Sequence, residues 1–321
     1  MKLIDIYNKA IETGMLHDPR GKDDVLKAIR RAEKAMADLK PEEQEYFDRE
    51  SLVNPYSDSR ILFGPTDSEV KTVLVGIDIE VGEVLLAEAI GRTGTHIDLI
   101  IGHHPEGTAY ANLYAVMNMQ SDILHRFGVP VNVAEGLMES RVREVERRLM
   151  PLNHTRAVDA ARLLGIPFMC LHTPADNMVV SFLQKLFDES KPETLGDLVG
   201  LIRDIPEYKN AAVNGAGPKI LVGARTRSAG RIFVDMTGGT EGSKDVFSRL
   251  VSAGVNTVVG MHISEDHRKE AEKNHMNVVI AGHISSDNLG VNLLLDEVMP
   301  GPEVRVLECS GFTRISRSVA S

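Results

Sequence analysis

Residues 97–106 read IDLIIGHHPE, a short apolar run that ends in two adjacent histidines. The run predicts a strand that is buried on both faces of a parallel sheet. Because neighbouring side chains of a strand point to opposite faces, His103 and His104 can converge only where the strand ends. Gly102 loosens the backbone there, and Pro105 restricts His104 to an extended conformation. Strand ends of open α/β sheets bind ligands, and imidazole is a common metal ligand. The stretch therefore predicts a metal site, with two solvated loop histidines as the alternative.

Buried strands alternate with helices from about residue 70 onward. A strand at 71–77, a helix at 80–92 and the strand at 97–101 form the first βαβ unit. Later apolar runs predict further strands at 129–133, 166–171, 220–223, 231–236, 256–260, 277–281, 304–307 and 312–315. This alternation predicts an α/β protein.

The first 66 residues differ from the rest of the chain. Residues 22–39 have apolar side chains at helical spacing, and the prolines, asparagine and serines of 41–65 indicate loops. We therefore expect a helical N-terminal extension over 1–66 that packs on the body. A loop-rich connector at 206–217 is the preferred boundary between a first α/β lobe, 67–205, and a second, 206–321.

Two other predicted strands also end in histidine and carboxylate residues. His172 and Asp176 follow the strand at 166–171, and His283 and Asp287 follow the strand at 277–281. His283 and Asp287 are four residues apart across a helix start, so they share one face. The alternative for Asp287 is that it complements the helix dipole. Together with the histidine pair, Asp176, His283 and Asp287 make a set of three imidazoles and two carboxylates. That set suits two divalent metals bridged by a carboxylate and roughly 3.5–4 Å apart.

A glycine-rich turn precedes a predicted helix at 244–253. Gly238, Gly239 and Gly242 expose backbone N–H groups that could hold a phosphate, although the spacing is not that of a Walker A loop. The alternative is a tight turn. General acid–base catalysis is assigned to His172, Glu265 or His267, and solvated first-turn side chains are the alternative for the last two.

Composition excludes several classes of protein. The chain has 321 residues and a net charge of −10, which argues against a nucleic-acid backbone or an anionic membrane as main partner. No apolar run approaches the roughly 20 residues that cross a bilayer, and the N-terminus turns acidic too early for a secretory signal. Cys170 and Cys309 form no CxxC pair, so a thiolate zinc site is not expected. We expect a cytoplasmic protein with a small-molecule substrate.

Three segments resemble one known family. They are 98–105 (DLIIGHHP), 172–176 (HTPAD) and 281–287 (AGHISSD). In these segments the sequence resembles the GTP cyclohydrolase I type 2-like family, also called the NGG-one-interacting-factor-three-like dinuclear metal proteins. The resemblance extends over about 71–297. It implies that the ligands of two metal ions are His103, His104, Asp176, His283 and Asp287. The family usually has Glu where this chain has Asp287, which shortens the reach by about 1.5 Å.

The resemblance also implies a fold and an activity. Two α/β sandwich lobes would hold a dinuclear metal site in the cleft between them, and copies of the chain would form a homo-oligomer, a ring-shaped hexamer. The two lobes could also interleave, with the C-terminal strand completing the first. The implied function is a metal-dependent hydrolase acting on a nucleotide, a pterin-like compound or a phosphoester. The alternative is a metal-binding scaffold or regulatory interaction protein without turnover. Histidine and carboxylate ligands suit Zn, Fe, Mn, Co or Ni.

Overall fold

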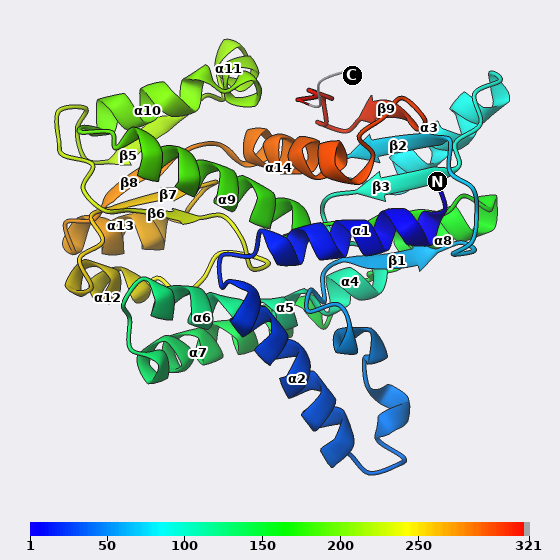
Figure 1. Cartoon of the computed structure of the whole chain (residues 1–321), viewed down its shortest axis with the longest axis horizontal. Coiled ribbons are helices and arrows are strands. Elements are labelled where there is room, and N and C mark those ends of the chain that lie inside the picture. Colours follow the sequence, from blue (N-terminus) through cyan, green and yellow to red (C-terminus); the bar gives the residue numbers. More distant parts are fainter. Residues whose placement is uncertain (318–321) are drawn as a thin grey trace.

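The structure is a computed structural model that describes residues 1–317. Two β-sheets lie toward opposite ends of the long axis, with helices around and between them (Figure 1). The first sheet consists of β1 (Arg60–Phe63), β2 (Thr72–Gly76), β3 (Leu99–Gly102), β4 (Phe168–Cys170) and β9 (Arg305–Cys309). The second sheet consists of β5 (Lys219–Val222), β6 (Ile232–Asp235), β7 (Thr257–Gly260) and β8 (Asn277–Ile280). The predicted α/β class with two lobes is confirmed.

The helices lie before, between and after these strands, often several in succession. Those before and within the first sheet are α1 (Leu3–Leu16), α2 (Lys22–Asp38), the 3₁₀ turns η1 (Gln44–Tyr46) and η2 (Arg49–Leu52), α3 (Val81–Arg92), α4 (Gly107–Ala111), α5 (Leu113–Val116), α6 (Met119–Arg126), α7 (Val131–Leu149) and α8 (Arg156–Leu164). Those that follow are α9 (Thr173–Ser190), α10 (Leu195–Asp204), α11 (Pro206–Val213), α12 (Val246–Ser252), α13 (Glu265–Lys273) and α14 (His283–Val298).

The two sheets repeat one topology. The strand order is β1-β4-β3-β2-β9 in the first sheet and β5-β8-β7-β6 in the second. In each sheet the first strand pairs antiparallel with the fourth, and the other pairs are parallel. The register also slips at the same place, between Ile61 and Phe63 in β1 and between Ile220 and Val222 in β5. The chain therefore builds the same four-stranded unit twice, and β9 extends only the first.

The central strands are apolar because helices cover both faces of each sheet. Along β2, Val73 and Val75 join the core beneath α1, whereas Leu74 faces the cluster formed with α3 and α8. Ile100 of β3 faces the same side as Leu74. This is the alternation of a strand buried on both sides, and it confirms the strand predicted at the centre of 97–106.

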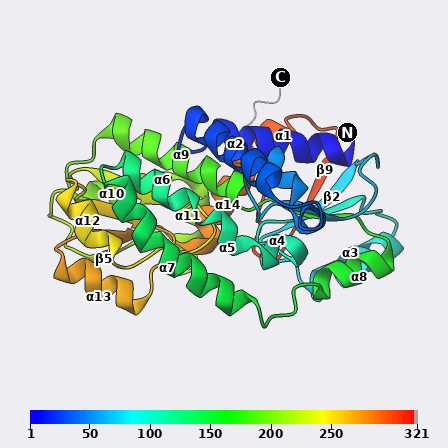
Figure 2. The same ribbon diagram turned by 90° about the horizontal axis from the view of Figure 1, so that it is seen from below.

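Helices α9 and α14 join the two lobes. They pack against each other, and both views show them side by side near the middle of the molecule (Figures 1 and 2). The contact is close because a Cβ atom at Gly290 would lie 2.4 Å from the carbonyl oxygen of Ala175. Helix α1 crosses α9 in the same way, since a Cβ atom at Gly14 would lie 2.7 Å from Cβ of Pro174. Small residues thus set the separation of the helices that begin at the ends of β4 and β8.

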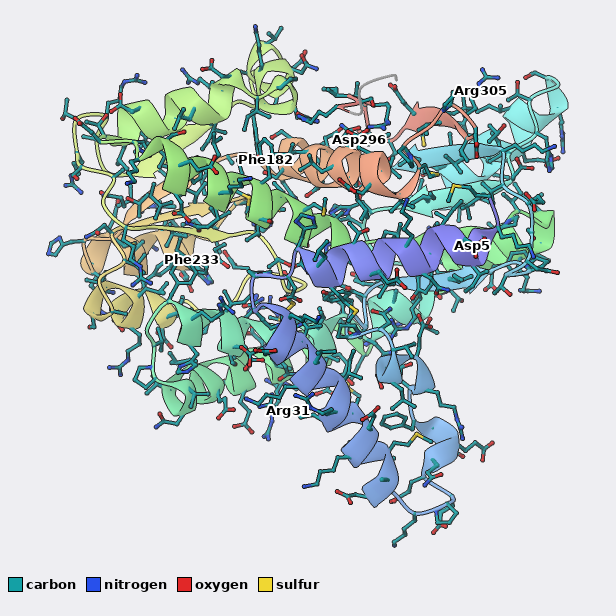
Figure 3. All side chains as sticks on the ribbon, viewed as in Figure 1. Asp5, Arg31, Phe182, Phe233, Asp296 and Arg305 are labelled. Carbon is teal, nitrogen blue, oxygen red and sulfur yellow. The ribbon has the colours of Figure 1, made fainter. Side chains whose placement is uncertain are left out.

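The N-terminal residues are helical, as predicted, but they are part of the body. Helix α1 packs on α9 and α14, and 60–63, predicted to be loop, form β1 in the first sheet. Only the arm from α2 to η2 extends away from the body. Figure 3 shows its side chains, Arg31 among them, reaching outward, and Arg31 is exposed.

Two other predicted strands are wrong. Residues 129–133 form no strand because Pro130, which has no N–H, caps the start of α7. Residues 312–315 instead run along α14, where the side chains of Asn288 and Asn292 accept hydrogen bonds from the backbone N–H groups of Thr313 and Ile315. Strand β9 lies beside β2, so a strand from the proposed second lobe, 206–321, belongs to the first sheet.

No helix within residues 1–317 is long and apolar enough to cross a membrane.

We predict that Gly290→Ala destabilises the protein by about 1–3 kcal/mol, because the added methyl group forces α9 and α14 apart. Gly200→Ala is the matched control. Gly200 is exposed in α10, and a Cβ atom added there would have nothing within 4 Å, so alanine should stabilise by about 0.5–1 kcal/mol through helix propensity. Urea unfolding followed by circular dichroism measures both. Equal stability of the two variants would contradict the close helix contact.

Candidate metal centre

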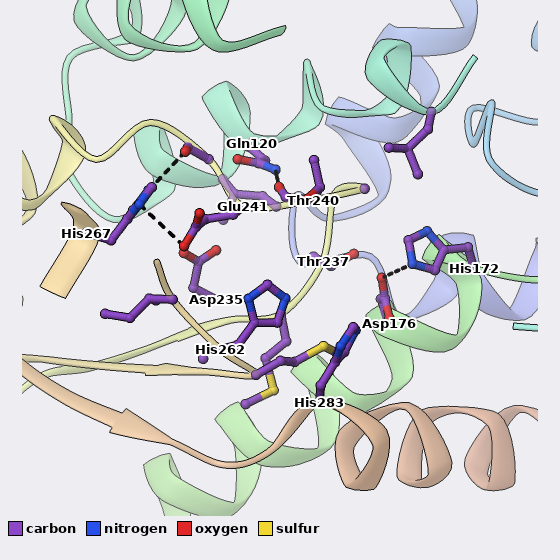
Figure 4. A pocket seen from close by; sticks show the side chains of 18 of the residues that line it. Gln120, His172, Asp176, Asp235, Thr237, Thr240, Glu241, His262, His267 and His283 are labelled. Carbon is purple, nitrogen blue, oxygen red and sulfur yellow. Dashed lines mark hydrogen bonds and ion pairs between the residues drawn. The ribbon is translucent and has the colours of Figure 1, made fainter. Parts of the chain in front are cut away.

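Three strand ends bring histidine and aspartate side chains to one place. His103 and His104 follow β3, and His172 and Asp176 lie at the start of α9, directly after β4. The third contribution comes from the second lobe, where α14 begins at His283 and places Asp287 one turn further on. Figure 4 shows His172, Asp176 and His283 approaching the cluster from the ribbons that carry them. The structure therefore brings together all six of these predicted residues.

The distances within the cluster are those of ligand atoms around a shared ion. Nε2 of His103 lies 3.5 Å from Oδ1 of Asp176 and 3.5 Å from Oδ1 of Asp287. The other oxygen of Asp287, Oδ2, lies 3.5 Å from Nε2 of His104 and 3.6 Å from Nε2 of His283. These separations exceed normal hydrogen-bond lengths. They are close to the roughly 3.3 Å between two ligand atoms that each lie about 2.0–2.1 Å from a tetrahedral metal ion. The shorter side chain of Asp287 therefore still reaches three histidines.

The atoms that face one another in the cluster are buried and unpaired. His103 and Asp287 are each 1% exposed and Asp176 is 4% exposed. Nε2 of His103, Oδ1 of Asp176 and both carboxylate oxygens of Asp287 have no hydrogen-bond partner among the described residues. Buried polar groups normally have partners, and leaving them without one costs about 1–3 kcal/mol each. Cations bound between these atoms would satisfy all four of them.

The histidines are oriented by hydrogen bonds at their other ring nitrogen. Nδ1 of His104 lies 2.7 Å from Oδ1 of Asp78, and Nδ1 of His172 lies 2.8 Å from Oδ2 of Asp58. Nδ1 of His103 faces the carbonyl oxygen of Leu171 at 3.3 Å. Each contact favours a proton on Nδ1 and leaves Nε2 free to bind. Metal-binding histidines typically have such partners.

The two aspartates have opposed electrostatic environments. Burial, together with the charges of Asp287 and Asp58, raises the pKa of Asp176 well above its usual range. Burial also opposes ionisation of Asp287, but the facing histidines outweigh it and hold its pKa low. Burial lowers the pKa of His103, whereas Asp287 and Asp78 overcome burial at His104 and raise its pKa to about 8. Two buried carboxylates that both face His103 are stable together in their ionised forms only with added positive charge.

The donor set fits a metal ion. Three groups of three donors have all their ligand atoms within 4.8 Å of one another: His103, His104 and His172; His104, His283 and Asp287; and His103, Asp176 and Asp287. Nitrogen and carboxylate oxygen donors suit divalent transition metals. The donors of these groups are histidine nitrogens and aspartate oxygens. The chain thus contains a buried histidine and aspartate cluster that is compatible with metal binding.

The other predicted catalytic residues lie away from the cluster. Glu265 does not line the cleft beside it and forms an ion pair with Arg268 at 2.7 Å. His267 does line the cleft, but Nδ1 lies 2.7 Å from Oγ of Ser264 and Nε2 lies 3.1 Å from the carbonyl oxygen of Gly242 (Figure 4). These contacts tie the glycine-rich loop to the start of α13. Catalytic roles for Glu265 and His267 stay predictions.

The glycine-rich loop packs against α6. Nε2 of Gln120 donates to the carbonyl oxygens of Gly238 and Thr240, both at 2.7 Å. A Cβ atom at Gly242 would lie 2.5 Å from Oε1 of the same glutamine, so glycine allows this approach. Gly239 and Gly242 line the cleft and Gly238 does not. The observed contacts account for these glycines as packing residues, and phosphate binding stays a prediction.

Sequence reasoning missed two residues of the site. Asp58, fully buried, lies in the segment assigned to the N-terminal extension and accepts hydrogen bonds from His172 and Thr173. Nothing local to Asp58 signals this contact, because its partners are more than 110 residues away. His262 follows β7 as His104 follows β3, and its ring centroid lies 4.8 Å from that of His283. The shared pattern of a strand-ending glycine with histidine two residues later was a usable signal for His262.

Comparisons with known proteins agree with this architecture. A NIF3 superfamily protein from Sphaerobacter thermophilus superposes with a TM-score of 0.70 and 29% sequence identity, covering 80% of this chain and 92% of its own. Reduced HcgD from Methanocaldococcus jannaschii has the same fold, with a TM-score of 0.51 and 13% identity, covering 83% of this chain and 94% of its own. No protein-family model and no curated protein matches the sequence.

Fold and site together define a two-lobed α/β protein with a histidine and aspartate cluster between its halves. The resemblance that the three sequence segments indicated is therefore confirmed, and this chain has the NIF3-like fold.

We predict that Asp176→Asn stabilises the metal-free protein at alkaline pH. The pKa of Asp176 is raised by folding, so its bound proton stabilises the fold, and this contribution is lost as pH rises above the unfolded-state pKa of about 3.9. Asparagine cannot ionise. After dialysis against a chelator, the variant should gain about 1–3 kcal/mol over the wild type at pH 8 and little at pH 4.

Urea unfolding at the two pH values measures this difference. Asp188→Asn is the control, because Asp188 is an exposed carboxylate of the same helix and its replacement should change stability by less than about 0.5 kcal/mol. If Asp176→Asn is less stable than the wild type at pH 8, ionisation of the buried carboxylate does not destabilise the fold.

Proposed function

We propose that this chain binds two divalent metal ions in the cluster and acts as a metal-dependent hydrolase. The observation that carries the proposal is the set of donor atoms that converge from both lobes, four of which are buried and have no hydrogen-bond partner among the described residues. They divide into two groups that share Asp287. His103 Nε2, Asp176 Oδ1 and Asp287 Oδ1 would hold one ion. His104 Nε2, His283 Nε2 and Asp287 Oδ2 would hold the other.

The number of donors supports catalysis over a purely structural role. Each group supplies three protein ligands, and structural sites usually supply four. A group of three leaves a position for water or substrate. When bound, two divalent ions would supply a nucleophilic water and would polarise the bond under attack. The remaining steps fall to side chains of the chain itself.

His172 is the side chain best placed to move a proton. Its Nε2 lies 3.7 Å from Oδ2 of Asp176, and the residue lines the cleft. Asp58 fixes the ring from behind at Nδ1, and Oγ of Ser59 accepts a hydrogen bond from the backbone N–H of His172. A histidine held in this way can accept a proton at Nε2 and return it to a leaving group.

The finer parts of the proposal rest on the family resemblance. A nucleotide, a pterin-like compound or a phosphoester as substrate, the ring-shaped hexamer and the cytoplasmic location all follow from the sequence and stay predictions. The donor set allows Zn, Fe, Mn, Co or Ni. A metal-binding scaffold without turnover is the alternative, and metal content and turnover together separate it from the hydrolase.

Protein purified without added metal should contain about two divalent ions per chain by elemental analysis. His103→Ala and His283→Ala should each remove about one, because each takes a ligand from a different group. His96→Ala is the control, since its side chain is 85% exposed and lies 3.6 Å from Asp98, outside the proposed ligand groups. Absence of metal in the wild type, with no uptake of Zn²⁺ or Mn²⁺, would refute the assignment of this site.

Turnover should depend on the same residues. We expect metal-loaded protein to hydrolyse at least one member of a panel of nucleotides, pterin-like compounds, phosphoesters and amides. The hydrolytic activity of the double variant with His103→Ala and His283→Ala should fall by about 100-fold or more, while His96→Ala retains activity. Activity that survives in the double variant would place the chemistry elsewhere. Full metal loading without turnover of any compound would favour the scaffold.

A further inference from the structure

The cleft beside the cluster has an unusual charge distribution. It has a volume of about 450 Å³ and extends from the cluster to the carboxyl ends of β6 and β7. Six of the described residues that line it are carboxylates: Asp78, Glu80, Glu106, Asp176, Asp235 and Glu241. None of its described lining residues is a lysine or an arginine. Sites that bind phosphate groups normally supply arginine, lysine or exposed backbone N–H groups.

Asp235 is the most distinctive of these carboxylates. It ends β6 opposite Gly260 of β7, its side chain is open to the cleft, and no described residue forms a hydrogen bond or ion pair with its carboxylate. Figure 4 shows it beside Glu241, on the side of the cleft that carries His262. Its low-dielectric surroundings and the charge of Glu241 raise the pKa of Asp235 to about 6. Asp235 is therefore an acceptor that faces a ligand space without a protein donor.

The opposite wall is acidic as well. Asp78, Glu80 and Glu106 line the cleft there. The cations nearest the glycine-rich loop are already engaged. Arg141 donates to the carbonyl oxygen of Glu241 and pairs with Glu144 at 2.9 Å, and Lys244 pairs with Asp266 at 3.3 Å.

The acidic lining belongs to a built site and is more than a surface cluster. Asp176 lines the same cleft, is 4% exposed and has Oδ1 unpaired. One end of the cleft thus offers buried donors suited to cations that would bind a substrate oxygen. The other end offers the unpartnered carboxylate of Asp235 and, beside it, Glu241, whose Oε1 already accepts a hydrogen bond from the backbone N–H of Ser264 at 2.6 Å and lies 3.3 Å from Nδ1 of His267. These carboxylates would bind positive charge or N–H groups.

We propose that the cleft selects a substrate bearing an ammonium, guanidinium or amidinium group, which Asp235 and Glu241 bind while the hydrolysable carbonyl or phosphoryl group lies at the metal centre. The proposal rests on the proposed function for the metal end of the cleft and adds the class of substrate. A nucleoside triphosphate fits least, because its outer phosphates would face carboxylates without a neutralising cation. A phosphate-free, N–H-rich compound, including a pterin-like one, remains compatible.

Binding of simple probes to the zinc-loaded full chain tests this. Agmatine carries a guanidinium and an ammonium group, and inorganic triphosphate carries only negative charge. Isothermal titration should show agmatine binding that weakens about tenfold in Asp235→Asn and weakens also in Glu241→Gln. Triphosphate should bind more tightly to Asp235→Asn than to the wild type, because a repelling charge is removed. Glu272→Gln is the matched control, a loss of one exposed carboxylate on α13 whose partner is Arg268.

The outcomes are separable from those of the metal assignment. Zinc content is measured on each sample, and Asp235 and Glu241 are not among the proposed ligands, so their variants should keep the wild-type zinc content. Agmatine binding that is equal in wild type, Asp235→Asn and Glu241→Gln would overturn the proposal. So would the absence of agmatine binding at millimolar concentration, or triphosphate binding that weakens in Asp235→Asn. Loss of zinc from the wild type would instead overturn the proposed function.

Discussion

Two buried aspartates with oxygens that lack a hydrogen-bond partner among the described residues define this molecule. Asp176 and Asp287 lie at the starts of α9 and α14, almost fully enclosed, with oxygen atoms that no described residue satisfies. Their histidine neighbours neutralise only part of this charge, which is why the pKa of Asp176 is raised while that of Asp287 is lowered. An arrangement of this kind is costly for folding alone and is typical of a site built for a cation.

The repeated topology explains how the site forms. In each sheet a helix follows the fourth strand: α9 follows β4, and α14 follows β8. These two helices pack on each other. Their close contact at Gly290 brings the carboxyl ends of both sheets to the same junction. The histidines after β3 then meet ligands from both repeats. Ligand binding at the carboxyl ends of strands, a general property of open α/β sheets, is here shared between two sheets.

The cleft combines opposite electrostatic properties at its two ends. At the junction, imidazoles and aspartates form a donor set for cations, and toward the second sheet Asp235 adds a carboxylate that has no hydrogen-bond or ion-pair partner among the described residues. The net charge of −10 reinforces the attraction of positively charged molecules at low ionic strength. The segment before β1 also contributes, since Asp58 holds the ring of His172 in place. The N-terminal part of the chain is thus both a structural and a functional component.

The sequence alone determined the α/β class and the ligand candidates, because buried apolar runs followed by histidine or aspartate are local patterns. His103, His104, Asp176, His283 and Asp287 were all identifiable in this way. Only the tertiary structure decided that β1 and β9 complete the first sheet, that Asp58 supports His172, and that Asp235 and His262 face the same cleft. These features depend on contacts between residues far apart in the chain. Such contacts are set by how helices and sheets pack, and no short segment encodes that packing.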